Sequence, residues 1–141
     1  MRPALIPTLI LALLPASFAV AQSAPAQLGP PMTADQFDER TRGKTIEYSA
    51  QGQPYGTEEY RPGHKVVWAF EGDECREGDW FPRGEQICFD YHDETELQCW
   101  TFHDTPGGLV ALFEGQDQGQ PLMSLRERAT PLNCPAPDLG V

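Results

Sequence analysis

The sequence predicts a mainly β fold, a small antiparallel up-and-down barrel of about eight strands preceded by one short N-terminal helix. From Lys44 onward, short segments alternate between apolar and polar residues, and clusters of glycine, proline and aspartate separate them. Closing such a meander removes its exposed edges, so a barrel is favoured over the alternative of an open sandwich. The expected strands cover residues 44–49, 55–61, 64–71, 78–82, 85–91, 97–103, 108–114 and 121–127.

The expected helix lies just before the strands, in the segment MTADQFDERTRGK. Thr33 can cap its N-terminus, and Gln36, three residues further on, completes a capping box. Met32 and Phe37 occupy the positions of a hydrophobic staple, and Gly43 can end the helix. After residue 21, this segment has the residue pattern most typical of a helix.

The first residues have the order of a secretory signal peptide. A basic Arg2 is followed by a short apolar run over residues 9–14 and by Ala19-Val20-Ala21, which matches an A-x-A cleavage site. We expect a signal peptide over residues 1–21, with cleavage after Ala21 and the pattern Ala24-Pro25-Ala26 as an alternative site. The apolar run is shorter than a membrane span, which needs about 20 residues, so no membrane anchor is expected after cleavage.

The remaining chain divides into a flexible proline-rich spacer over residues 22–32, one domain over residues 33–134 and a C-terminal tail over residues 135–141. Because Arg2 leaves with the leader, the 10 basic residues of the chain become 9 against 21 acidic ones, a formal charge of −12. Such a charge repels nucleic acid and anionic lipid, and it favours a basic protein partner or simply solubility.

Four cysteines follow the leader, and an exported chain meets an oxidising environment in which disulfides persist. Spacing alone leaves three pairings open. A two-residue turn at Asp93-Glu94 would place Cys88 directly opposite Cys99 on neighbouring strands, where a cross-strand disulfide fits. By elimination, Cys75 would tether the tail through Cys134. Zinc is the alternative, but the chain has no C-x-x-C spacing.

The alternation also assigns an inner face to the barrel. Of the adjacent Glu58 and Glu59, Glu58 points inward if Tyr60 does. A carboxylate among inward aromatic side chains is a natural polar anchor in an apolar ligand cavity. The alternatives are that Glu58 lies in water at the barrel mouth or pairs with a basic residue, and that the barrel is filled by its own side chains. The predicted ligand-binding residues are Glu58, Trp68, Phe70, Trp80, Phe89, Tyr91, Trp100 and Phe102.

Catalytic and metal-binding patterns are weak. The expected register separates His92 and His103 too far for one metal ion, so both are expected to be free surface histidines. A thiol of Cys99 held in a disulfide cannot act as a nucleophile with His103. The carboxylates around Cys75 lack the ligand spacing of a calcium loop. We therefore expect no catalytic residues, no metal and no cofactor.

Several segments resemble known domains. GKTIEYSAQGQPYGTEEYRPG, WAFEGDECREGDWFPRGEQICFDYHDE and QCWTF are together similar to short secreted bacterial lipocalin-like (calycin-style) β-barrel domains of unknown function. The shared pattern is a GKT opening, Y-x-P-G, G-x-W, an I-C-F strand and a C-W strand. The resemblance covers about residues 33–134. It implies a small barrel with ligand or protein binding and no assigned chemistry.

These observations predict a monomeric, non-enzymatic exported β-barrel, periplasmic or secreted, that binds a small apolar or amphipathic ligand. The alternative is a periplasmic protein-binding module, such as an inhibitor of a basic hydrolase like lysozyme or a protease. The negative charge motivates the alternative, because it would speed encounter with a basic partner. The inward carboxylate motivates the first.

Overall fold

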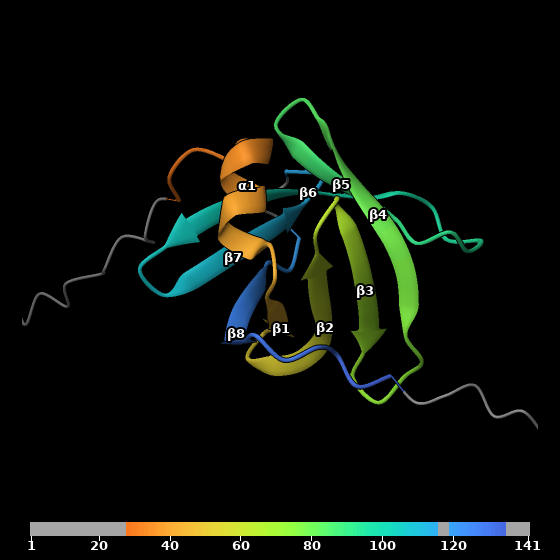
Figure 1. Cartoon of the computed structure of the whole chain (residues 1–141). Helices are drawn as coiled ribbons and strands as arrows, with labels where there is room; N and C mark the ends of the chain where they lie inside the picture. Colours follow the sequence, from red (N-terminus) through yellow and green to blue (C-terminus); the bar gives the residue numbers. More distant parts are fainter. Residues whose placement is uncertain (1–27, 116–118, 135–141) are drawn as a thin grey trace, which may run out of the picture.

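The computed structural model describes residues 28–115 and 119–134, and these form one closed antiparallel barrel of eight strands with a short helix at one end (Figure 1). The predicted fold class is therefore confirmed. The predicted signal peptide, most of the spacer and residues 135–141 lie outside the described residues. The elements are α1 (Ala34–Thr41), β1 (Thr45–Ala50), β2 (Gln53–Arg61), β3 (Lys65–Phe70), β4 (Arg76–Arg83), β5 (Gln86–Asp90), β6 (Gln98–Thr105), β7 (Gly108–Phe113) and β8 (Leu122–Arg128).

Each strand pairs with the next along the chain, and β1 pairs with β8 to close the barrel. The break predicted at residues 52–54 is partly wrong, because Gln53 and Pro54 belong to β2. A register shift lets Pro54 pair with Ser49 while the pairing skips Tyr55. A proline is tolerated at such a bulge, where the regular ladder of hydrogen bonds is already interrupted.

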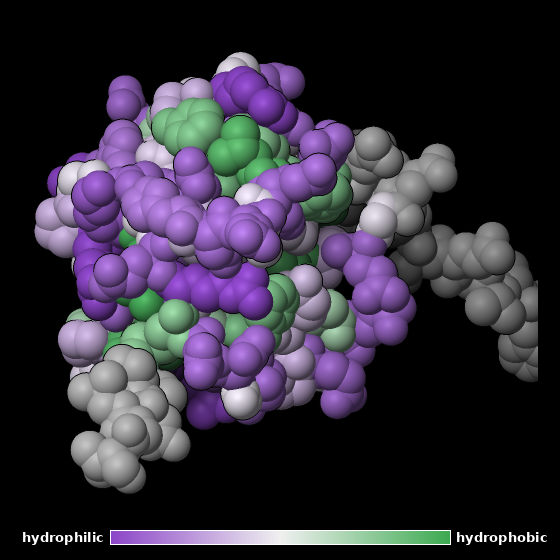
Figure 2. Space-filling model, turned by 90° about the vertical axis from the view of Figure 1, so that its right-hand side faces the viewer, coloured by the Kyte–Doolittle hydropathy of each residue, from purple (hydrophilic) through white to green (hydrophobic). Residues whose placement is uncertain are grey.

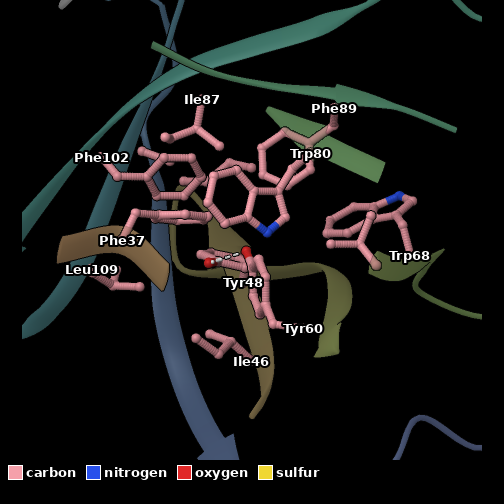
Figure 3. Packing of buried hydrophobic residues seen from close by; sticks show 13 residues of the cluster. Phe37, Ile46, Tyr48, Tyr60, Trp68, Trp80, Ile87, Phe89, Phe102 and Leu109 are labelled. Carbon is pink, nitrogen blue, oxygen red and sulfur yellow. Dashed lines mark hydrogen bonds between the residues drawn. The ribbon is translucent and has the colours of Figure 1, made fainter. Parts of the chain in front are cut away.

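Helix α1 closes one end of the barrel. Its predicted capping box is present: the Thr33 hydroxyl accepts from the backbone of Gln36, and the Gln36 side chain accepts from the backbone of Thr33. Phe37 projects from the helix into the barrel and is 0% exposed. Its ring lies 4.5 Å from that of Phe102 and 5.1 Å from that of Trp80, measured between centroids (Figure 3). The helix therefore acts as an apolar plug.

The segment before the helix lies against the outside of β6. The backbone N–H of Met32 donates to the carbonyl oxygen of Phe102, so ordered structure begins before the predicted domain boundary at residue 33. This segment also corrects the prediction that His103 is a free surface histidine. His103 is 6% exposed, and its Nδ1 lies 2.7 Å from the carbonyl oxygen of Gly29. The covering backbone segment, which alternation within the strand could not reveal, buries this imidazole.

Both predicted disulfides are present, Cys88–Cys99 and Cys75–Cys134. The residues Cys88 and Cys99 are paired across β5 and β6 as expected. The predicted two-residue turn is wrong, because the strands end at Asp90 and resume at Gln98, which leaves a longer loop with the same centre. Two disulfides indicate an oxidising, extracytoplasmic compartment.

The other disulfide anchors the chain after β8 to the start of β4. On the way, this segment passes the outer face of β2, where the backbone N–H of Leu132 donates to Oε2 of Glu59 over 2.9 Å. Arg61 binds the same carboxylate at 2.7 Å. Among the residues that the structure describes, no helix has the length and apolar character needed to cross a bilayer.

Candidate ligand-binding cavity

The barrel interior contains a cavity of about 150 Å³, and no residue of α1 lines it. A cavity of this size in an apolar protein interior can hold a molecule such as benzene. Strands β1 to β8 contribute most of its walls, and the loop between β5 and β6 contributes the rest. The lining residues are Tyr48, Tyr55, Glu58, Tyr60, Trp68, Phe70, Arg76, Phe89, Tyr91, Thr95, Gln98, Trp100, Phe102, Ala111 and Leu122.

The structure brings seven of the predicted residues into this lining, namely Glu58, Trp68, Phe70, Phe89, Tyr91, Trp100 and Phe102. Trp80 is not among the lining residues. It has the predicted inward orientation and is buried, but it lies at the plugged end, between the edge of Phe37 and the imidazole of His64. The His64 and Trp80 rings stack at 3.7 Å between centroids. Alternation gives the face of a strand and does not give the height along the barrel axis, so Trp80 could not be separated from the others.

Glu58 is the central polar group of the cavity. Its side chain points inward as predicted and is 3% exposed. The hydroxyl of Tyr91 donates to Oε2 over 2.8 Å, whereas Oε1 has no hydrogen-bond partner among the described residues. Burial raises the pKa of Glu58 to about 8, and the hydrogen bond from Tyr91 opposes that rise only in part. The carboxyl group therefore does not lie in water at the mouth of the barrel. Among the described residues, no basic side chain pairs with it.

Two further tyrosines form a polar pair in the interior, Tyr48 from β1 and Tyr60 from β2. Their hydroxyl oxygens lie 2.8 Å apart, as the dashed line in Figure 3 shows. Burial raises the pKa of both phenols above its usual range, so both stay neutral. Because each hydroxyl already has the other as a partner, this pair is satisfied, in contrast to Oε1 of Glu58.

Arg76 is a lining residue that the sequence interpretation missed. β4 begins at Arg76, two residues earlier than predicted, and Arg76 has the same inward parity as Trp80. Its guanidinium carbon lies 5.4 Å from the centroid of the Phe70 ring, a cation–π arrangement, and its Nη1 lies 3.5 Å from Oδ2 of Asp93. The guanidinium is thus engaged by an aromatic face and by a carboxylate of the loop between β5 and β6.

Tyr55 was missed for a different reason. Strict alternation along β2 places it on the outer face with Glu59, but the bulge in the pairing with β1 interrupts that alternation. Tyr55 consequently joins the lining, and its ring lies 5.5 Å from that of Phe70 and 6.0 Å from that of Trp68. Re-aiming a side chain in this way is a common consequence of a β-bulge.

Comparison with known proteins finds no matching family model, no similar curated protein and no similar solved structure. The site therefore has to be interpreted from its own chemistry. The similarity to lipocalin-like domains stays a prediction, while the closed barrel is shown.

The groups that line the cavity are suited to holding a small molecule. Within residues 28–115 and 119–134, His, Cys, Asp and Glu side chains form no group of three that could hold a metal ion. The cavity offers aromatic surface, one carboxyl group with a free oxygen, and a guanidinium that is already engaged. This combination can surround a small molecule and orient it through one polar contact.

Proposed function

We propose that this chain is a non-enzymatic, exported binding barrel that holds a small apolar or amphipathic ligand in the cavity, with Glu58 as the polar anchor. The single observation that carries the proposal is the free Oε1 of Glu58 in a cavity of about 150 Å³. A buried polar atom without a partner costs about 1 to 3 kcal/mol, and a ligand that supplies the missing hydrogen bond would recover part of that cost.

The route of export rests on the N-terminal leader. A signal peptide over residues 1–21, cleaved after Ala21, would deliver the domain to the periplasm or the medium, where its two disulfides form. N-terminal sequencing of the protein secreted by its host tests this part. A start at Gln22 or Gln27 supports it, and retention of Met1 in the exported protein contradicts it.

A cavity-filling variant tests ligand binding. Toluene matches the cavity in size, and a bound ligand raises the melting temperature of a protein. We expect toluene to raise the melting temperature of the wild-type protein and to have little effect on Ala111→Leu, because Ala111 lines the cavity. The matched control is Ala129→Leu, which makes the same change at an exposed position just after β8. No shift in the wild type, or an equal shift in Ala111→Leu, would contradict the proposal.

The natural ligand can be sought by mass. Protein purified from an oxidising compartment is weighed under native conditions and again after denaturation. We expect a mass excess that denaturation removes, and Ala111→Leu prepared in the same way should lack it. An excess that persists in the filled variant would place the ligand elsewhere on the protein.

A second candidate function rests on the net charge of −11. The face shown in Figure 2 is covered mostly by hydrophilic residues, which suits a protein that meets a basic partner through charge. Under this proposal, immobilised domain retains a basic hydrolase such as lysozyme at low salt and releases it at high salt. Failure to retain basic hydrolases at low salt would remove this candidate.

A further inference from the structure

The free oxygen of Glu58 lies inside an aromatic enclosure. Tyr91 already supplies one hydrogen bond to Oε2, and the Tyr48–Tyr60 pair is self-satisfied, so these hydroxyls do not serve Oε1. The surrounding walls include Trp68, Phe70, Tyr91 and Trp100. Aromatic faces attract cations electrostatically, and an ionised carboxylate accepts hydrogen bonds and donates none. Oε1 of Glu58 therefore suits a ligand group that is cationic and that donates a hydrogen bond.

We propose that the ligand of this cavity is a small arylalkylamine, whose ammonium group donates to Oε1 of Glu58 while its ring packs between the aromatic walls. The inference rests on the proposed binding function and names the ligand class. The competing ligand is a neutral molecule that accepts a hydrogen bond from the protonated form of Glu58. The two differ in charge, so they respond to pH in opposite ways.

The charges around the site favour the amine. Arg76, the basic residue of the lining, is held by Asp93 and by the face of Phe70, so its charge is already balanced at the rim. The chain carries 21 acidic residues against 10 basic ones, and this field attracts cations. A small cation that enters past Arg76 then meets Glu58 as the one carboxyl group of the lining.

The titratable groups that face Glu58 are few. Tyr91 comes from the loop after β5, Tyr48 from β1 and Tyr60 from β2, and burial raises the pKa of these three phenols. Tyr55 of β2 is the fourth tyrosine of the lining. β4 contributes Arg76, and β3, β6, β7 and β8 contribute no titratable residue to the lining. Glu58, whose pKa is raised to about 8, is therefore the lining group that changes charge near neutral pH.

This assignment fixes the sign of the pH dependence. Below about pH 8 the carboxyl group is mostly protonated, so a cation must displace that proton in order to bind. The affinity for an amine should therefore rise up to about tenfold per pH unit between about pH 6 and pH 8. An alkylamine stays protonated over this range. A neutral acceptor ligand would bind with constant affinity over this range and more weakly above it.

Calorimetric titration with benzylamine and benzyl alcohol, which have nearly the same shape, tests the inference. At about pH 8 we expect benzylamine to bind about tenfold more tightly than benzyl alcohol. We also expect benzylamine binding at about pH 6 to release close to one proton, read from titrations in two buffers of different ionisation enthalpy. In Glu58→Gln the pH dependence and the preference for the amine should both disappear, while benzyl alcohol still binds.

Glu59→Gln is the matched control. It makes the same change one residue along β2 on the outer face, and it should leave benzylamine binding and its pH dependence unaltered. Equal affinities for the two probes, or an amine affinity that is flat or falls as the pH rises, would overturn the amine assignment. In that case the binding of benzyl alcohol and toluene would still support the proposed function. If neither probe nor toluene binds, both the assignment and the proposed function are overturned.

Discussion

The two halves of the barrel interior are built from the same strands and have different contents. On the side of α1, Phe37 fills the space between the strands, and Ile46, Trp80, Phe102 and Leu109 belong to the same buried cluster (Figure 3). On the far side lies a cavity of about 150 Å³, which is lined in part by Glu58 and by the loop between β5 and β6. An eight-stranded barrel is just wide enough to be filled by side chains or to hold one small ligand. One half of this barrel is filled by side chains, and the other half contains the cavity.

The two halves differ in whether a segment outside the barrel contributes a side chain to the interior. The strands alone do not fill the interior at either end, and a side chain delivered from outside the barrel closes one of them. By the same reasoning, we propose that a molecule from outside the chain completes the other half. Variants that alter one half and spare the other test whether the two halves differ in this way.

The largest effect is expected at the plugged end. Phe37→Ala should lower the free energy of unfolding by about 3 to 5 kcal/mol, because it removes a fully buried ring that contacts several aromatic side chains. Urea denaturation measures the change. The control is Phe81→Ala on the outer face of β4, where the ring is 38% exposed and the cost should stay below about 1 kcal/mol. Equal losses in the two variants would show that the plug is not the stabilising element.

The next effect concerns Glu58, where a substitution is expected to raise the free energy of unfolding. A carboxyl group whose pKa is raised in the folded state binds its proton more tightly there than in the unfolded chain. The stability that this proton provides is lost as the pH rises from about 4.5 to about 8, by roughly 4 kcal/mol. Glu58→Gln should therefore be more stable than the wild type at pH values above about 7, and urea denaturation over this pH range should show a flatter profile.

Glu59 provides the internal contrast to this prediction. Its pKa is lowered, chiefly by the hydrogen bond from Arg61 and in part by that from the backbone of Leu132. Stability from such a group is present above its unfolded pKa and lost as the pH falls through its folded pKa. Glu59→Gln should therefore destabilise the protein by about 1 kcal/mol at neutral pH. A gain in stability in both variants would contradict the assignment of the two carboxyl groups to opposite faces.

An effect smaller than those at Phe37 and Glu58 is expected at Gly56 in the open half. A Cβ atom there would collide with the indole of Trp68 and lie 2.7 Å from the carbonyl oxygen of Ala69. Gly56→Ala should cost about 2 kcal/mol, shift the tryptophan emission and weaken toluene binding, because the ring of Trp68 must move. Gly107→Ala is the control, since its added Cβ atom has only one neighbour, at 3.8 Å. Unchanged emission and binding in Gly56→Ala would show that Trp68 does not shape the cavity.

Local pattern predicted much of this structure. Period-two alternation located the strands and turned Glu58, Trp68 and Phe89 inward, and the register placed Cys88 opposite Cys99. These features depend on side-chain direction along one strand or on the pairing of neighbouring strands.

The remaining features depend on contacts between distant segments. The bulge that turns Tyr55 inward arises from the pairing with β1, and the burial of His103 arises from backbone near Gly29. The division of the interior depends on how far Phe37 reaches along the barrel axis, so Trp80 was assigned to the wrong half. Alternation contains no information about height along that axis.

A crystal structure of the domain grown with benzylamine would test whether Glu58 anchors an amine in the cavity. We expect electron density for one benzylamine molecule in the cavity. Its nitrogen should lie within hydrogen-bonding distance of Oε1 of Glu58, and its ring against Trp68 or Tyr91. An empty or collapsed cavity at saturating benzylamine, with the molecule bound elsewhere or absent, would contradict it.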